Sequence, residues 1–130
     1  MILDNIVAYK KIQIEKEKEK TPLDILLPYV EDRKTRNFKA ALCNENISFI
    51  AEIKRASPSK GVIKEDFDPV LTAEIYEEAQ VDAVSILTER NFFMGSDEYI
   101  AGAKKVNSKP VLRKDFIIDE YQLFQSKAIG

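Results

Sequence analysis

Three charged residues interrupt two short apolar runs that otherwise have the composition of buried strands. Glu52 and Lys54 lie in the run Phe49–Lys54, and Lys114 lies in the run Val111–Asp115. Side chains alternate between the two faces of a strand, so Glu52 and Lys54 are expected on the same face. Strands buried in a parallel sheet are normally apolar throughout, and charges at their carboxyl ends are typical of active sites in α/β folds.

A carboxylate and two ammonium groups at one rim of a sheet could transfer protons and bind anions. Burial and a neighbouring like charge both lower the pKa of a lysine, whereas Glu52 would oppose that change. A lysine brought toward neutrality acts as a general acid, and a charged lysine binds phosphate or carboxylate groups. The alternative interpretation is a solvent-exposed ion pair between Glu52 and Lys54 without a catalytic role. The strand pattern leaves both interpretations open.

Two loops carry further candidate residues, one after the run Phe49–Lys54 and one after a second predicted strand at residues 83–88. The first contains Ser57, Pro58 and Ser59, whose hydroxyl and backbone N–H groups could bind an anion over the site. Ser and Pro are also ordinary turn residues, so a plain turn is the alternative. The second loop contains the adjacent aromatic residues Phe92 and Phe93. One of them would line an apolar pocket or stack on an aromatic ligand, or else both would pack beneath their own loop.

The elements that must position these side chains follow the order β-α-β-α-β-α. The predicted strands are 49–54, 83–88 and 111–115, and the helical patterns begin at Asp68, Ser96 and Asp119. Strands that alternate with helices pair in parallel through right-handed crossovers. An open doubly wound sheet and a closed (β/α)8 barrel both fit this order. The chain lacks GxGxxG after its first strand and lacks GxxxxGK[ST], which removes the main support for a nucleotide-binding doubly wound fold.

The composition narrows the classes of partner and compartment. Of the 130 residues, 45% are hydrophobic and 32% are charged, which is typical of a globular protein. A formal net charge of −2 provides no basic surface, so we expect neither a nucleic acid nor a membrane as partner. The chain has no histidine, which excludes His-based triads and His metal sites. A single cysteine, Cys43, and no signal-peptide pattern favour a cytoplasmic location.

Several motifs together resemble the indole-3-glycerol phosphate synthase family. Residues 50–61, IAEIKRASPSKG, are similar to the signature of that family. Three further blocks match in order and spacing: 85–89 (SILTE), 92–96 (FFMGS) and 110–116 (PVLRKDF). The helical segment at the N-terminus also resembles the family's N-terminal extension. One departure is the segment 80–82 (QVD), where the family usually carries a glycine at the end of the helix that begins near Asp68.

The resemblance implies a carboxy-lyase of tryptophan biosynthesis. The family closes the pyrrole ring of 1-(2-carboxyphenylamino)-1-deoxyribulose 5-phosphate, with loss of CO₂ and water, and uses neither a metal nor an organic cofactor. By resemblance, Lys114 is the general acid that protonates the substrate carbonyl oxygen. Lys54 binds the anionic substrate and serves as an acid in the dehydration, while Glu52 pairs with Lys54 and positions the substrate.

The resemblance also implies a set of residues that surround the substrate. Ser57, with its neighbours Pro58 and Ser59, would lie over the substrate. Phe93 and Phe116 would flank its anthranilate ring. The implied ligand is therefore an anionic, phosphorylated small molecule with an aromatic ring.

The implied fold is a (β/α)8 TIM barrel that this chain fills only in part. We expect residues 1–47 to form the helical extension and residues 48–130 to form the first three β-α units, together as one domain. A complete barrel needs about 250 residues, so the general base and the phosphate-binding loops of later strands are expected to be missing and the isolated chain inactive. Such a chain is expected to self-associate or to bind a complementary C-terminal half. The alternative function is a non-catalytic half-barrel module that binds a phosphorylated ligand or that half.

Overall fold

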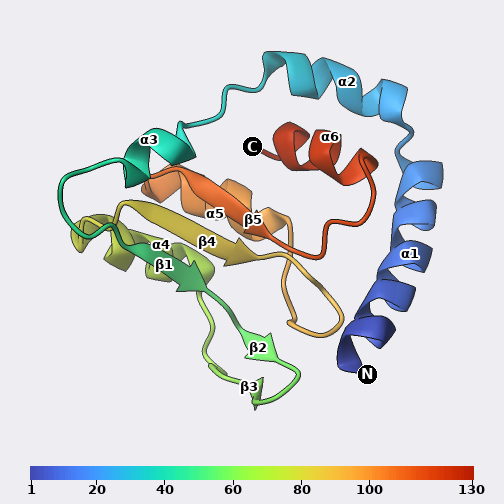
Figure 1. Cartoon of the computed structure of the whole chain (residues 1–130), viewed down its shortest axis with the longest axis horizontal. Coiled ribbons are helices and arrows are strands. Elements are labelled where there is room, and N and C mark those ends of the chain that lie inside the picture. The colour runs from blue at the N-terminus through green and yellow to red at the C-terminus, as the bar shows by residue number, and fades with distance from the viewer. The chain divides into compact units, whose positions relative to one another are not determined.

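A computed structural model describes all residues from 1 to 130, and these form two compact units. One unit, here called the helical unit, contains Met1–Lys34 and Phe116–Gly130, and the other, the sheet unit, contains Thr35–Asp115. The elements in chain order are α1 (Ile2–Lys20), α2 (Leu23–Asp32), α3 (Phe38–Leu42), β1 (Ile50–Ile53), β2 (Ala56–Ser57), β3 (Gly61–Val62), α4 (Pro69–Glu78), β4 (Ala83–Leu87), α5 (Glu98–Val106), β5 (Val111–Lys114) and α6 (Tyr121–Ala128) (Figure 1). None of the helices is long and apolar enough to cross a lipid bilayer.

The sheet unit is built on three parallel strands in the order β1-β4-β5. Each strand lies within one of the predicted apolar runs, α4 connects β1 to β4, and α5 connects β4 to β5. Both helices lie on the same side of the sheet, behind it in Figure 1. The expected alternation of parallel strands and helices is therefore confirmed. β1 and β5 form the two edges of this sheet.

The register gives the two faces of the sheet different surroundings. Glu52 pairs laterally with Ser85, and Ser85 pairs with Leu112, so these three side chains share one face. On the opposite face, Ile53 is 1% exposed and Ile86 is 0% exposed, which makes them part of the core beneath α4 and α5. Leu112, in contrast, is 44% exposed. The charged candidate residues therefore belong to the face that these two helices leave uncovered.

Individual residues mark the beginning and the end of helix α4. Its start is capped by Asp68, whose side chain accepts hydrogen bonds from the backbone N–H groups of Val70 and Leu71, both at 3.0 Å. Two residues after its last turn, Gln80 adopts a positive φ of 54°. This left-handed conformation favours glycine, the residue that the resemblance leads one to expect there. The substitution of Gln for Gly therefore falls at a backbone position where it is strained.

The segment before β1 is attached to the far end of α5 through one arginine. Arg36 Nη1 donates to the carbonyl oxygens of Asn107 at 2.7 Å and Lys109 at 2.9 Å, and Nη2 donates to that of Lys104 at 3.3 Å. The carbonyls that end a helix have no partner within it, so this guanidinium supplies one. Residues from Thr35 onward consequently belong to the sheet unit. The expected division of the chain after residue 47 differs from this one and stays a prediction.

The helical unit is held by a small apolar core and two polar contacts at one place. Its buried residues from α1, α2 and α6 are Ile14, Leu26, Tyr121 and Ala128. The hydroxyl of Tyr121 donates to the backbone carbonyl of Thr21 at 2.8 Å, and Lys18 Nζ lies 2.7 Å from a carboxylate oxygen of Asp119. These contacts join the end of α1 to the beginning of α6. Helix α6 also packs against α2.

Candidate active site

The structure brings together the three charged residues that the strand pattern singles out. Glu52 Oε1 lies 2.7 Å from Lys54 Nζ, and Glu52 Oε2 lies 2.5 Å from Lys114 Nζ. Both lysines are at the carboxyl ends of their strands, one directly after β1 and the other closing β5. One carboxylate thus lies between two ammonium groups at the rim of the sheet where α/β proteins build their sites.

Partial burial and hydrogen bonding act in opposite directions on Glu52. Burial raises the pKa of its carboxyl, but the hydrogen bond from Lys114 and then that from Lys54 lower it, and their sum holds the pKa below its usual range. The carboxyl is therefore ionised at neutral pH, and the cluster of two cations and one anion carries a net positive charge. Such a cluster attracts anions and has protons to donate.

The residues between the charged side chains are short and mostly apolar. Leu87 on the central strand pairs laterally with Lys114, and Ser85, two residues earlier, lies between Glu52 and Leu112. The hydroxyl oxygen of Ser85 is buried and has no hydrogen-bond partner. The sequence pattern did not single out Ser85, Leu87 or Leu112, because apolar or small residues in a strand carry no chemical signal of their own.

The backbone carbonyls of Glu52 and Lys114 accept hydrogen bonds from neighbouring elements. The hydroxyl of Tyr76 on α4 donates to the carbonyl oxygen of Glu52 at 2.8 Å. The N–H of Thr88 donates to the carbonyl oxygen of Lys114 at 3.0 Å. The carbonyl oxygens of Glu52 and Lys114 are therefore both hydrogen-bonded, which favours a defined geometry of the two side chains.

Arg113 and Asp115, which flank Lys114 in sequence, form a polar network on the other face of the sheet. Arg113 Nη2 lies 3.1 Å from Oδ1 of Asp97 and 3.8 Å from Oδ2 of Asp115. The hydroxyl of Thr88 donates to Asp115 Oδ2 at 2.8 Å, and Arg113 Nε donates to that hydroxyl at 3.2 Å. This network fixes the end of β5 next to β4.

The loop after β1 forms a small hairpin that the sequence pattern did not predict. Strands β2 and β3 pair antiparallel through Ser57 and Gly61, and Gly61 has a φ of +63°. Ser57 Oγ accepts a hydrogen bond from the N–H of Lys60 at 3.3 Å and lies 3.4 Å from Ser59 Oγ. The side chain of Ser57 is half-buried, whereas Pro58 and Ser59 are exposed. The turn interpretation therefore describes the local structure, and a ligand contact from these residues stays a prediction.

The two aromatic residues expected to flank a ligand ring lie in different units. Phe93 is half-buried in the loop after β4, within the sheet unit. Phe116 belongs to the helical unit, where its carbonyl oxygen accepts a hydrogen bond from Gln122 Nε2 at 2.9 Å. Phe93 therefore belongs to the same unit as the three charged residues, and a ligand contact from either ring stays a prediction.

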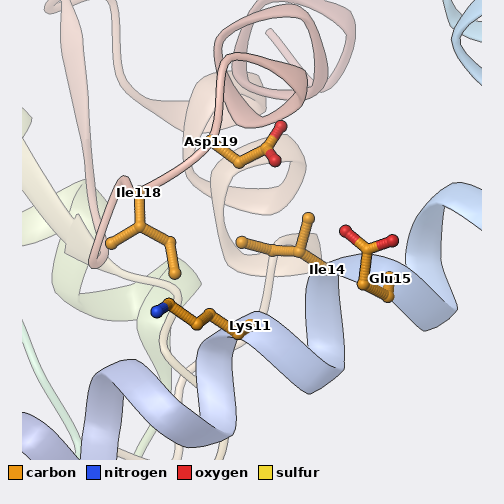
Figure 2. Close-up of a pocket in the computed structure, with 5 residues that line it drawn as sticks. All are labelled: Lys11, Ile14, Glu15, Ile118 and Asp119. Carbon is orange, nitrogen blue, oxygen red and sulfur yellow. The ribbon is translucent and has the colours of Figure 1, made fainter.

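The helical unit contains a separate cavity that none of the predicted site residues lines. Figure 2 shows its five lining residues, three from α1 and two from the segment before α6, namely Lys11, Ile14, Glu15, Ile118 and Asp119. Its volume is about 340 Å³, and its lining combines charged side chains of both signs with two isoleucines. No group of three His, Cys, Asp or Glu side chains in the structure is placed to hold a metal ion.

Fold and site together define a class of protein, an α/β protein with acid–base side chains at the carboxyl ends of parallel strands. Comparison with protein families then identifies the group. The family model described as indole-3-glycerol phosphate synthase matches residues 3–130. The chain therefore belongs to the indole-3-glycerol phosphate synthase family.

Individual relatives agree with this assignment. The chain is 54% identical over 130 residues to the indole-3-glycerol phosphate synthase of Thermoanaerobacter pseudethanolicus, covering all of this chain and 50% of the relative. It is 58% identical over 132 residues to the enzyme of that name from Clostridium acetobutylicum, again with 100% and 50% coverage. The relative from Alkaliphilus metalliredigens is 53% identical over 132 residues, with 51% of its length covered. The chain thus spans about half the length of the curated relatives it matches.

Proposed function

We propose that this chain supplies the acid groups of an indole-3-glycerol phosphate synthase, a carboxy-lyase of tryptophan biosynthesis. The observation that carries the proposal is the contact of one carboxylate, that of Glu52, with the ammonium groups of both Lys54 and Lys114. Membership of the family supports it, since the three residues fall in the motifs by which the chain resembles that family.

In the proposed reaction Lys114 acts first, during ring closure. Its ammonium group donates a proton to the carbonyl oxygen of 1-(2-carboxyphenylamino)-1-deoxyribulose 5-phosphate while an aromatic carbon of the anthranilate forms a bond to the carbonyl carbon. The carboxylate on that aromatic carbon then leaves as CO₂, and the electrons of the broken bond restore the aromatic ring. A protonated lysine at the strand end suits this step because the developing negative charge on oxygen is neutralised as it forms.

Lys54 acts on the anionic substrate and on the water that leaves. Its ammonium group binds a carboxylate or phosphate oxygen and then donates the proton with which the hydroxyl group departs as water. Glu52 holds both ammonium groups in place and is itself ionised at neutral pH, because hydrogen bonds from the lysines outweigh the effect of its burial on its pKa. The proton that must be removed from the substrate is taken by a base outside this chain.

The remaining substrate contacts follow from the family motifs. Ser57, Pro58 and Ser59 on the hairpin would cover the substrate, and the rings of Phe93 and Phe116 would bracket the anthranilate. The hairpin directly follows β1, and the loop with Phe93 directly follows β4, so both begin at the rim that carries the charged cluster. No cofactor or metal has a part in this proposal.

The proposed architecture is a (β/α)8 barrel of which this chain provides the beginning. Residues 1–47 are the helical extension, and residues 48–130 are the first three β-α units of one domain. The open edges of β1 and β5 and the exposure of Ile50 and Leu112 on the inner face support this proposal, because a closed barrel would pair both edges and fill that face. The proposed partners are the phosphorylated substrate and a complementary half-barrel, in the cytoplasm.

The decisive experiment joins or mixes the chain with a second half-barrel taken from a relative and measures formation of indole glycerol phosphate. The wild-type assembly should turn over the substrate, and Lys114→Ala should lower kcat by a factor of about 10² to 10⁴, the usual contribution of a general acid. Lys105→Ala serves as the matched control, since Lys105 is exposed on α5, which lies on the other side of the sheet.

Two results would count against the proposal. Unchanged turnover in Lys114→Ala would show that Lys114 is not the general acid. An assembled, folded wild-type protein that binds the substrate without converting it would favour a non-catalytic half-barrel module instead.

A further inference from the structure

A buried carboxylate that has no part in the proposed chemistry lies immediately beyond β4. Glu89 is 0% exposed, and its carboxylate accepts hydrogen bonds from three consecutive backbone N–H groups. Oε1 accepts from Asn91 at 3.1 Å, and Oε2 accepts from Phe92 at 2.6 Å and from Phe93 at 3.1 Å. Charge-assisted bonds of this kind are stronger than neutral ones, so they hold the backbone of this loop firmly.

The same loop is closed a second time through its backbone. The N–H of Gly95 donates to the carbonyl oxygen of Glu89 at 2.7 Å, and Met94 turns the chain with a φ of +53°. A Cβ atom at Gly95 would lie only 2.4 Å from the carbonyl oxygen of Leu87, so the returning chain touches the end of β4. Residues 89–95 therefore form a loop whose shape is set before any ligand binds.

This loop is also connected to the strand that carries Lys114. Thr88, the residue before Glu89, donates its N–H to the carbonyl oxygen of Lys114 at 3.0 Å. The peptide bond between Thr88 and Glu89 thus links a hydrogen bond to β5 with the hydrogen bonds that the Glu89 carboxylate accepts from the loop, including that from the N–H of Phe93. The position of Phe93 is consequently defined relative to the charged cluster and not only within its own loop.

We propose that Glu89 is a positioning residue that presents Phe93 as a fixed wall for the aromatic ring of the substrate. This inference rests on the proposed function, because it explains how Phe93 is held in place beside the anthranilate ring of the proposed substrate. Prior ordering of a contact residue lowers the entropy that binding must remove, so Glu89 should act on substrate affinity more than on the chemical step.

The test uses the assembled enzyme with Glu89→Gln, Phe93→Ala and the double variant. Glu89→Gln keeps the size of the side chain but replaces one acceptor oxygen with an NH₂ group that faces N–H donors. It should raise KM roughly tenfold with little change in kcat, as expected for lost ground-state binding. Phe93→Ala should raise KM similarly, and Glu89→Gln should add little more in the Phe93→Ala background, because both changes remove one interaction. Amide hydrogen exchange at residues 91–93 should accelerate in Glu89→Gln.

The matched control is Glu98→Gln, an identical change at an exposed position in the first turn of α5. It should leave KM and amide exchange as in the wild type. Equal effects of Glu89→Gln on KM with and without Phe93 would overturn the inference, as would an unchanged KM in a variant whose loop amides exchange faster. Failure of the proposed function appears separately, as a wild-type assembly without turnover or a Lys114→Ala variant with full activity.

Discussion

Lys114 Nζ on β5 lies 2.5 Å from Oε2 of Glu52 on β1, although β4 runs between the two strands. Two strand spacings amount to about 10 Å, which only long side chains that lean toward each other can span. The central strand permits the contact because it contributes Ser85 and Leu87 to this face, and neither is charged. The ion pair between Glu52 and Lys114 therefore depends on the uncharged side chains that the central strand places between them.

The pKa of Glu52 should rise when either lysine is replaced, and more for Lys114→Met than for Lys54→Met. Hydrogen bonds from Lys114 and then Lys54 lower this pKa against the opposing effect of burial, and burial remains after the substitution. Carbon-13 NMR of the glutamate carboxyl groups, recorded as a function of pH, measures the change. Lys105→Met is the control and should leave the pKa of Glu52 unchanged. An unchanged Glu52 pKa in Lys114→Met would contradict the observed contact between the two side chains.

The same shift gives stability a definite dependence on pH. A carboxyl whose pKa is lower in the folded state adds stability that is complete above its unfolded pKa of about 4.3 and disappears as the pH falls through the folded pKa. Urea unfolding between neutral and acidic pH should show this loss in the wild type. The portion due to Glu52 should be absent in Glu52→Gln.

Gln80→Gly should stabilise the protein by about 0.5 to 1 kcal/mol, because a residue with a side chain is strained at a φ of 54° and glycine is not. Urea unfolding midpoints provide the measurement. Glu74→Gly, at an exposed position inside α4, is the matched control and should destabilise by about 1 kcal/mol. Equal signs for the two variants would show that the left-handed conformation at Gln80 carries no cost.

Gly95→Ala should destabilise the protein by about 1 to 3 kcal/mol, because its Cβ would lie 2.4 Å from a backbone oxygen that cannot rotate away. Gly102→Ala provides the comparison. There the nearest atom is a side-chain methyl group of Val70 at 3.0 Å, and alanine also favours the helix, so the smaller loss is expected. Thermal unfolding of both variants, with loop 89–95 monitored by NMR, would reveal a reversed order.

Arg36→Lys should lower the free energy of unfolding by about 1 to 2 kcal/mol although it preserves the charge, because an ammonium group cannot reproduce the planar fork that contacts three carbonyl oxygens. Arg33→Lys, three residues earlier and exposed, should change stability by less than about 0.5 kcal/mol. Chemical denaturation distinguishes the two. A neutral Arg36→Lys would mean that solvent satisfies these carbonyls equally well.

The parts of the fold that could be predicted are those that local sequence patterns indicate, such as strand alternation and helix caps. Alternation along residues 49–54 correctly separated Glu52 and Lys54 from Ile53, and a cap followed by proline located the start of α4 at Asp68. Each of these inferences needs only neighbours within a few residues, where backbone geometry fixes which way a side chain points.

The parts that could not be predicted depend on contacts between distant residues or on backbone angles. The three carbonyls that Arg36 binds lie about 70 positions away, and no spacing rule connects them. The hairpin at residues 56–62 consists of strands two residues long, too short for a periodic signal. Glu89 has the sequence context of a surface acid after a strand, and only the backbone conformation of residues 91–93 brings their N–H groups onto its carboxylate.

Because both carboxylate oxygens of Glu52 are already engaged by ammonium groups, the resting cluster provides its own counter-ion. A ligand with a single negative charge would have to displace the Glu52 carboxylate from one of its two lysines. The ion pair it forms would be offset by the ion pair it breaks. A ligand with several negative groups can instead engage the lysines while leaving the carboxylate in contact with one of them. We therefore expect binding at this cluster to depend on the number and spacing of negative charges on the ligand, and not on its net charge alone.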